Sequence, residues 1–472
     1  MKQILQNQRT GELTVAEVPV PVLQRGRVLV RTAASLVSAG TERMSLQLAQ
    51  KSLLGKARER PDLVKQVVQK YKTEGLVSTV NAVRAKLDAN KALGYSAAGI
   101  VVEVGPDVTG LRAGDRVACA GADFASHAEM LSVPQNLCVR LPEGVSFEAG
   151  AFGTLGAIAL QGVRLAEPSL GEAVVVIGLG LLGQLTVQLL KANGCRVFGL
   201  DLDASKVKLA RELGADASTV SGREAQQEVI NWTRGRGADA VLITAATASN
   251  EPIELAGEIS RAKGRVVAVG LVGLDVPRQT FYERELTLKI SMSYGPGRYD
   301  PDYEERGHDY PFAYVRWTEQ RNIEAFLDLV AQQRINVLPL ITHRFPIAQA
   351  ERAYELISSS SEPYLGVLLQ YETGAEIQRT IELKTSRASA NEVRLGVIGA
   401  GNYVTGKLLP QFKAAGVEFC SIASASGTSA RTVVRSRSSG KVSTPPMVSA
   451  ATMPWASATW ASMSLAVTSP IA

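Results

Sequence analysis

A glycine-rich turn after an apolar segment is the feature of this sequence best suited to chemistry. Residues Ala173–Ile177 are apolar and mostly β-branched, which predicts a buried parallel strand. A Gly-x-Gly-x-x-Gly motif follows at 178–183, and five of its six residues are expected at the cofactor: Gly178, Gly180, Leu181, Leu182 and Gly183. Such glycines allow a tight turn, a close backbone approach to a pyrophosphate, and close packing of the next helix. Because the amino end of the helix predicted over 185–191 favours an anion, the turn predicts a dinucleotide-binding site.

An acidic residue ends the next predicted strand. Asp201 follows the segment 196–200 and lies eighteen residues beyond Gly183. A carboxylate in this place accepts a hydrogen bond from a ribose 2′-hydroxyl, whereas it would repel a 2′-phosphate. We therefore expect NAD as the cofactor in preference to NADP.

The composition indicates a large globular chain. It has 472 residues, 46% of them hydrophobic, and its apolar runs are much shorter than the roughly 20 residues of a membrane helix. Its four cysteines are scattered, and residues 1–9 lack the apolar stretch of a secretion signal. We therefore expect a cytoplasmic protein of two or three domains, without disulfides and without a membrane partner.

The hydrophobic rhythm changes along the chain. Residues 12–42 and 94–150 alternate short apolar runs with Gly, Pro and Asp turns, which predicts a β-rich domain. Residues 155–295 alternate strand and helix patterns, which predicts a doubly wound parallel sheet. Residues 320–371 return to the first style. The strands expected in the parallel sheet are 173–177, 196–200, 240–244, 265–269 and 286–291.

This order of segments is similar to the plan of the medium-chain dehydrogenase/reductase family. Besides the glycine turn, the runs 99–117, 270–273 and 340–345 carry the similarity, which extends over about residues 1–371. The resemblance implies a GroES-like catalytic domain at 1–155 with a helical insertion at 45–91, an NAD-binding Rossmann domain at 156–298, and a return to the catalytic domain at 299–372.

The carboxyl-terminal part has a different character. Residues 373–392 are polar and indicate a linker, and residues 393–426 resemble the amino terminus of the Gfo/Idh/MocA oxidoreductases, a second NAD(P)-binding family. Val404 stands where that turn has its third small residue, and 422–426 carry no acid. A structural role and a cofactor-binding role are therefore both open for this partial Rossmann segment. No Asp or Glu occurs in the last 54 residues, and we expect an irregular, disordered tail over 427–472.

Many members of the first family hold a catalytic zinc through a Cys, a Gly-His-Glu motif, and a later Cys or Asp. The matching positions here carry Ser38, Tyr95, Ser96 and Phe152. Neutral Ser and Tyr are poor zinc ligands, and Phe is none. We therefore expect an enzyme without catalytic zinc and without another metal site.

Without zinc, hydride transfer still needs a hydrogen-bond donor to the substrate oxygen. Tyr95 is the first candidate, because it occupies the place of the zinc-binding His. Ser38 and Thr41 are second, with Glu42 beside them as an orienter or base. Each has a plainer alternative: a buried tyrosine with a satisfied hydroxyl, a Ser/Thr turn, or a solvated carboxylate. His127 is expected to be a packed or rim residue.

Three more residues are expected at the cofactor. Gly270 and Gly273 would let the nicotinamide approach the backbone. Arg298 lies in a loop where, in the resembling family, an arginine can reach the pyrophosphate; the alternative is an ordinary exposed loop arginine.

The sequence of the helical insertion predicts two or three helices, for instance over 62–72 and 78–90. It is basic, with ten Lys or Arg against four Asp or Glu between residues 51 and 91. It could form a lid for an acidic substrate such as a uronic acid, a phosphorylated sugar or a nucleotide-sugar. A solvated helix face or an oligomer contact is the favoured alternative. The basic residues lack interleaved aromatics, so no nucleic-acid partner is expected.

Together these features predict an NAD-dependent, zinc-independent oxidoreductase that interconverts an alcohol and a carbonyl. The expected substrate is a small sugar or polyol derivative, and we expect a homo-oligomer. Two alternatives follow from the missing zinc ligands: a reductase of enones or quinones, and a non-catalytic dinucleotide-binding sensor or assembly subunit.

Overall fold

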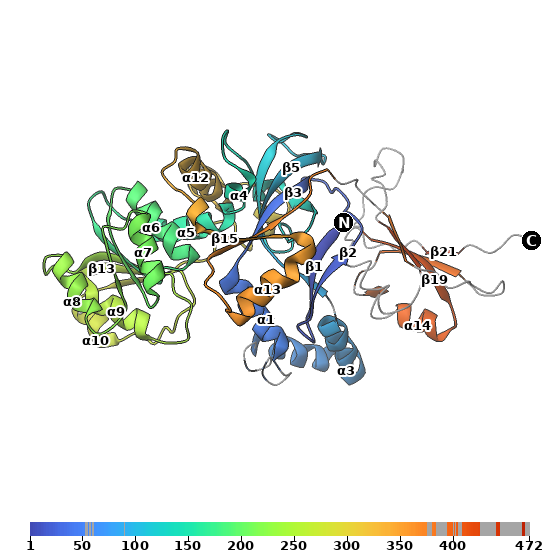
Figure 1. The fold of residues 1–472 in the computed structure, drawn as a ribbon. Helices are drawn as coiled ribbons and strands as arrows, with labels where there is room; N and C mark the ends of the chain where they lie inside the picture. Colours follow the sequence, from blue (N-terminus) through green and yellow to red (C-terminus); the bar gives the residue numbers. More distant parts are fainter. Residues whose placement is uncertain are drawn as a thin grey trace, which may run out of the picture.

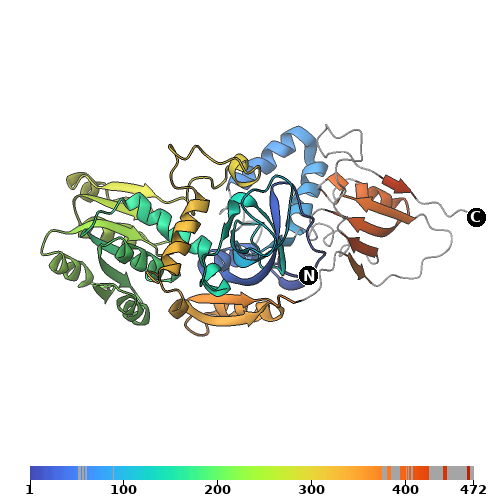
Figure 2. The same ribbon diagram turned by 90° about the horizontal axis from the view of Figure 1, so that it is seen from above.

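The chain folds into a row of separate bodies, seen from two directions in Figures 1 and 2. This computed structural model describes residues 1–51, 55, 58, 61–88, 90–374, 380–383, 394–399, 401, 403–404, 408–424, 440–443 and 465–467. A helix-covered parallel sheet lies at one end, a β-rich body lies in the middle, and a smaller sheet lies at the other end (Figure 1). Within these residues no helix has the length and apolar character needed to cross a membrane.

The first body is a six-stranded parallel sheet with the strand order β11-β10-β9-β12-β13-β14. The order reverses beside β9, so the carboxyl ends of β9 and β12 flank a crevice. The predicted doubly wound sheet is confirmed, with β11 as an edge strand that the pattern did not predict. The strands are β9 (Ala173–Ile177), β10 (Arg196–Asp201), β11 (Ala217–Val220), β12 (Ala238–Ile243), β13 (Ser260–Ala268) and β14 (Thr287–Ile290). The helices are α5 (Gly153–Ala166), α6 (Leu181–Ala192), α7 (Ala204–Glu212), α8 (Ala225–Trp232), α9 (Glu251–Ile259) and α10 (Arg278–Glu283).

The β-rich body contains a seven-stranded and a three-stranded sheet. In the larger sheet the strand order is β15-β16-β3-β5-β6-β8, with β7 also paired to β3, and the smaller sheet is β2-β1-β4. Because β16 pairs with β3, the chain beyond the parallel sheet completes the body that the amino-terminal residues began. The strands are β1 (Lys2–Asn7), β2 (Leu13–Glu17), β3 (Arg27–Val37), β4 (Asn90–Ala92), β5 (Ser96–Val104), β6 (Arg116–Ala120), β7 (Met130–Pro134), β8 (Cys138–Arg140), β15 (Ile341–Pro346) and β16 (Gly366–Gln370).

Helices surround this middle body. The insertion at 45–91 contributes the second half of α1 (Ala39–Gln50) and all of α3 (Pro61–Asp88), and both helices lie below the sheets in Figure 1. The two helices predicted over 62–72 and 78–90 correspond to the halves of α3, which is interrupted at Gly75, a residue with a φ of +79°. The remaining helices are α4 (Phe147–Gly150), α11 (Pro301–Glu304), α12 (Glu319–Ala331) and α13 (Ala350–Ser359).

The third body is a five-stranded sheet with the order β17-β20-β19-β18-β21. Parallel strands β18 (Arg394–Ile398) and β19 (Glu418–Ala423) flank α14 (Leu409–Ala414) in a β-α-β unit. The stretch predicted to be an irregular tail contributes β20 (Gly440–Ser443) and β21 (Leu465–Val467), and the predicted linker contributes β17 (Thr380–Leu383). The rest of that tail, and most of the linker, lies outside the described residues.

Candidate functional site

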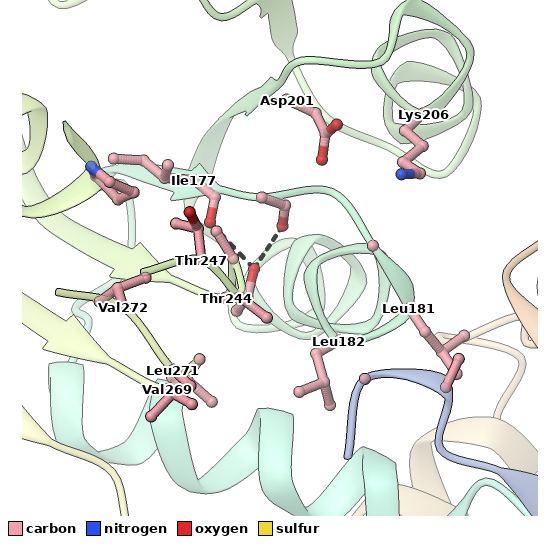
Figure 3. Close-up of a pocket in the computed structure, with 18 of the residues that line it drawn as sticks. Ile177, Leu181, Leu182, Asp201, Lys206, Thr244, Thr247, Val269, Leu271 and Val272 are labelled. Atoms are coloured by element: carbon pink, nitrogen blue, oxygen red, sulfur yellow. Dashed lines mark hydrogen bonds between the residues drawn. The ribbon is translucent and has the colours of Figure 1, made fainter. Parts of the chain in front are cut away.

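A cavity of about 2290 Å³ joins the parallel sheet to the β-rich body. Its walls include the turn after β9, the ends of β10, β12 and β13, and the start of α1; Figure 3 shows part of it. Of the predicted site residues, Glu42 and Gly183 do not reach the wall. The others all line the cavity: Ser38, Thr41, Tyr95, Gly178, Gly180, Leu181, Leu182, Asp201, Gly270, Gly273 and Arg298.

The glycine turn is closed by direct backbone packing. Gly178 has a φ of +92°, and a Cβ there would lie 2.5 Å from the Ala245 nitrogen. A Cβ on Gly183 would lie 1.9 Å from the Gly178 carbonyl oxygen, which also accepts a hydrogen bond from Thr244 Oγ1 (Figure 3). Gly180, the N-cap of α6, has nothing within 4 Å of its Cβ position. The backbone of the turn is therefore tightly packed at Gly178 and Gly183 but open to the cavity at Gly180, an arrangement that suits a pyrophosphate.

Asp201 lies beyond this turn at the end of β10. Its carboxylate accepts the backbone N–H of Leu179 at 2.6 Å and that of Asp203 at 2.9 Å. The carboxylate is thereby fixed against the turn where a ribose would lie. Sequence analysis missed two cations that line the same end, Lys206 and Arg223. Figure 3 shows Lys206 beside Asp201, and its Nζ lies 3.6 Å from the Asp203 carboxylate.

Gly270 and Gly273, which follow β13 and line the cavity, are packed closely against neighbouring residues. A Cβ on Gly270 would lie 2.0 Å from the Ala245 carbonyl oxygen, and one on Gly273 would lie 2.3 Å from Asn250 Oδ1. Close packing of the segment after β13 against the segment after β12 therefore requires both glycines.

Arg298 is not an ordinary exposed loop arginine. Its side chain is 13% exposed, its guanidinium lies 4.0 Å from the centre of the Tyr299 ring, and Nη1 donates to Glu304 Oε1 at 2.5 Å. The guanidinium is therefore held at the cavity wall by a carboxylate and an aromatic face. Its reach to a pyrophosphate stays a prediction.

The predicted hydroxyls meet at the other end of the cavity. Tyr95 Oη donates to Ser38 Oγ at 2.6 Å, and Ser38 Oγ donates to Thr41 Oγ1 at 3.3 Å. Burial raises the pKa of Tyr95; the hydrogen bonds of Ser38 and Thr41 lower it, and the Glu42 charge raises it. With its pKa raised, Tyr95 is a neutral hydrogen-bond donor at neutral pH.

Glu42 lies one layer deeper and is not a solvated carboxylate. Glu42 is only 3% exposed, and its Oε1 accepts a hydrogen bond from the backbone N–H of Ser38 at 2.9 Å. His127 Nε2 lies 3.3 Å from both carboxylate oxygens, and the Tyr354 hydroxyl donates to Oε2. His127 is fully buried, as a packed residue would be, but sequence analysis missed both partners of Glu42. No local pattern marks them, because Glu42 in α1, Tyr354 in α13 and His127 in the segment before β7 are brought together only by the packing of distant parts of the chain.

The residues at the expected zinc positions do not fit a zinc ion. Tyr95 and Ser38 are bonded to each other, Ser96 Oγ donates to the Ala151 carbonyl at 2.7 Å, and Phe152 is fully buried. In the part of the chain that the structure describes, no group of three or more His, Cys, Asp or Glu residues could hold a metal. Hydroxyls that are neutral and already paired are poor ligands for zinc.

Among the described residues of the basic insertion at 45–91, only Gln47 reaches the cavity, whereas Arg43 and Met44 precede the insertion in the same helix. Arg43, Met44 and Gln47 of α1 line the cavity, whereas no described residue of α3 does. A lid over this cavity would therefore consist of α1.

Comparisons with known proteins agree with this architecture. Residues 68–160 match the alcohol dehydrogenase GroES-like domain family, and residues 182–306 match the zinc-binding dehydrogenase family. The second family is described as zinc-binding, whereas the side chains at the expected zinc positions of this chain do not suit a zinc ion.

Among curated proteins, sorbitol dehydrogenase from Homo sapiens is 28% identical over 294 residues, covering 56% of this chain and 75% of its own. Among solved structures, galactitol-1-phosphate dehydrogenase from Escherichia coli has a TM-score of 0.59 at 21% identity, covering 78% of this chain and 100% of its own. For 2R,3R-butanediol dehydrogenase from Bacillus subtilis the TM-score is 0.57 at 18% identity, with 78% and 99% covered. The two domain matches and the curated relatives are consistent with an alcohol dehydrogenase-like oxidoreductase of the medium-chain dehydrogenase/reductase type, and the solved structures share the fold of this chain.

Proposed function

We propose that this chain is an NAD-dependent, zinc-independent oxidoreductase that interconverts an alcohol and a carbonyl on a polyol or sugar derivative. The observation that carries the proposal is the chain of hydroxyls from Tyr95 through Ser38 to Thr41. It lines the same cavity as the glycine turn and Asp201, at the positions where zinc ligands are expected. The substrate class is carried over from relatives that act on sorbitol, galactitol 1-phosphate and butanediol.

The hydroxyl chain can serve the substrate oxygen without a metal. Tyr95 stays protonated because burial raises its pKa, so it can donate a hydrogen bond to a carbonyl oxygen. When Tyr95 turns its hydrogen to the substrate, Ser38 can donate to the Tyr95 oxygen and Thr41 can donate to Ser38. Thr41 is exposed, so the chain ends at water and lets a proton be replaced.

The cofactor end is proposed from the same cavity. A bound dinucleotide would accept or supply the hydride. The Asp201 carboxylate, fixed by the Leu179 and Asp203 amides, favours a ribose hydroxyl over a 2′-phosphate. Arg298, held by Glu304, is proposed to face the pyrophosphate.

Replacing one hydroxyl tests the proposal. Tyr95→Phe should lower kcat for NADH-dependent reduction of the best substrate from a panel of ketoses and sugar carbonyls by roughly 100-fold, because general-acid groups contribute about that much. NADH affinity should not change. The matched control is Tyr303→Phe, since the Tyr303 hydroxyl is also buried and bonded, to Thr318 Oγ1 at 2.8 Å, but does not line the cavity.

Two results would overturn the proposal. Full activity of Tyr95→Phe would remove the donor role of Tyr95. Loss of activity after treatment with a zinc chelator, with recovery on adding Zn²⁺, would overturn zinc independence.

A further inference from the structure

A buried carboxylate lies directly behind the hydroxyl chain and faces several donors. Glu42 accepts from the Ser38 amide, from His127 Nε2 and from the Tyr354 hydroxyl. Neither Glu42 nor His127 nor Tyr354 lines the cavity, and each is at most 3% exposed. A general base needs a free lone pair that reaches the substrate, and this carboxylate offers none on the cavity side.

A second row of polar groups holds the imidazole. Ser35 Oγ lies 2.7 Å from His127 Nδ1 and 2.7 Å from the Tyr371 hydroxyl. The distances agree with one direction of donation, in which Tyr371 donates to Ser35, Ser35 donates to Nδ1, and Nε2–H donates to Glu42.

The backbone leaves room for this imidazole at one position. A Cβ on Gly94 would lie 2.7 Å from the His127 ring. The residue that precedes Tyr95 is therefore a glycine because the His127 ring packs against it. The same short segment thus supplies the proposed donor and makes space for the group behind it.

We propose that Glu42, His127 and Tyr354 form a carboxylate clamp that positions Ser38 and Tyr95 for the reaction, with Glu42 acting as a positioning residue and not as a base. The inference rests on the proposed function, because it assigns these side chains to the hydroxyl chain of that site. Glu42 fixes the Ser38 amide, and Ser38 is the hydrogen-bond acceptor of Tyr95. His127 and Tyr354 in turn keep the charged carboxylate hydrogen-bonded away from water, which a buried charge requires.

The clamp also acts on Tyr95 through its charge. Three side chains face the Tyr95 hydroxyl with a resolved influence on its pKa: Ser38, Thr41 and Glu42. A negative charge at Glu42 opposes formation of a phenolate, so it keeps the donor protonated. The Tyr354 hydroxyl on the other side of Glu42 is likewise neutral, since burial and the Glu42 charge raise its pKa.

A measurement on the protein without substrate tests the charge. With ¹³Cζ-labelled tyrosine, the NMR signal of Tyr95 is assigned by its loss in Tyr95→Phe and titrated in the wild type and in Glu42→Gln. Removing the charge should lower the pKa of Tyr95, because the Glu42 charge opposes formation of the phenolate. An unchanged titration would overturn the charge effect, whatever substrate the enzyme uses, so this result is independent of the proposed function.

Kinetics test the positioning. Tyr354→Phe removes one donor to Glu42 and should lower kcat about tenfold while KM stays within about twofold, because only the placement of Ser38 and Tyr95 changes. Tyr303→Phe, which removes a buried hydroxyl outside the clamp, should leave kcat near the wild-type value. Equal losses in both variants, measured at equal folded fraction by circular dichroism, would show a merely structural role.

Rescue by a conservative variant separates His127 from general packing. His127→Gln retains an amide donor for Glu42 and should keep more activity than His127→Ala by about tenfold. If both variants lose activity equally while folding normally, the hydrogen bond to Glu42 is not what matters. If Tyr95→Phe is fully active but Glu42→Gln still shifts the Tyr95 titration, the proposed function fails and the clamp stands.

Discussion

The two glycine turns of this chain begin alike and then diverge. Gly178 and Gly399 each follow a parallel strand, and each has a φ of +92°. A Cβ on Gly178 would collide with the Ala245 backbone, whereas the same position on Gly399 meets no described residue within 4 Å. The first turn is therefore packed against a neighbouring strand end, and no such contact is found for the second turn in the part of the chain that the structure describes.

The third position of the motif separates them further. Gly183 lies against the Gly178 carbonyl, so α6 closes directly on its own turn. Val404 takes the corresponding place in the second turn, is 6% exposed, and packs in an apolar cluster. That cluster also contains Leu395, Val397, Leu409 and Ile422. We therefore expect a dinucleotide site at the first turn and none at the second, because the third residue of the motif sets how closely the following helix approaches the turn.

The carboxylate differs as well. Asp201 ends β10 and is fixed by two backbone amides. At the end of β19, Ala423 and Ser424 provide no acid. The comparison predicts one dinucleotide site per chain, at the first turn.

The largest effect is expected where the first turn is tightest. Gly183→Ala places a methyl group 1.9 Å from a backbone oxygen, so α6 must move and NADH affinity should fall by roughly 100-fold or more. Gly401→Ala, whose Cβ position has no atom within 4 Å, should leave affinity unchanged. Titration of NADH fluorescence measures both, and equal losses would break the comparison.

A medium effect is expected at the carboxylate. Asp201→Ala removes the proposed ribose acceptor and should weaken NADH binding about tenfold, since a hydrogen bond to a charged group contributes about 1.5–3 kcal/mol. The preference for NADH over NADPH should narrow or reverse. Adding an acid to the second turn with Ser424→Asp should create no further NADH site, which calorimetric stoichiometry checks. A second equivalent bound there would contradict the comparison.

The smallest effect on the cofactor site is expected at Glu319, which lies behind the loop that carries Arg298. Glu319 is fully buried beside Glu304 and Arg298, and burial first and the Glu304 charge second raise its pKa to about 9. The folded protein thus retains a proton that the unfolded chain releases near its ordinary pKa. This stability is complete below that pKa and is lost as the pH rises towards 9.

Glu319→Gln should therefore flatten the pH dependence of stability. Between pH 6 and pH 8.5 the wild-type Tm should fall by several degrees more than that of the variant, because a pKa raised from 4.5 to about 9 corresponds to about 3 kcal/mol of stability lost over this range. Calorimetry at the two pH values measures the difference. Parallel curves would mean that Glu319 is ionised in the folded protein.

Most of the fold could be predicted from local patterns, and the exceptions have physical reasons. The apolar run Ala173–Ile177 is a fully buried strand with the predicted bounds, because a central parallel strand is apolar on both faces. The edge strand Ala217–Val220 was missed because its sequence, Ala-Ser-Thr-Val, lacks that apolar run. The two helices predicted over 62–72 and 78–90 are the halves of α3, which is broken at Gly75 because a residue with a positive φ interrupts the helix.

By itself the sequence determined the first turn, its carboxylate Asp201 and the hydroxyls at the expected zinc positions. These are local features, since a turn and its flanking strand are specified by residues close together in the chain. Only the tertiary structure decided what surrounds Glu42. His127 lies 85 residues from Glu42 in the chain and Tyr354 lies 312 residues away, and the chain that returns through β16 beside β3 brings Tyr354 there. Such partners leave no pattern in sequence because a buried hydrogen bond needs proximity in space and not spacing along the chain.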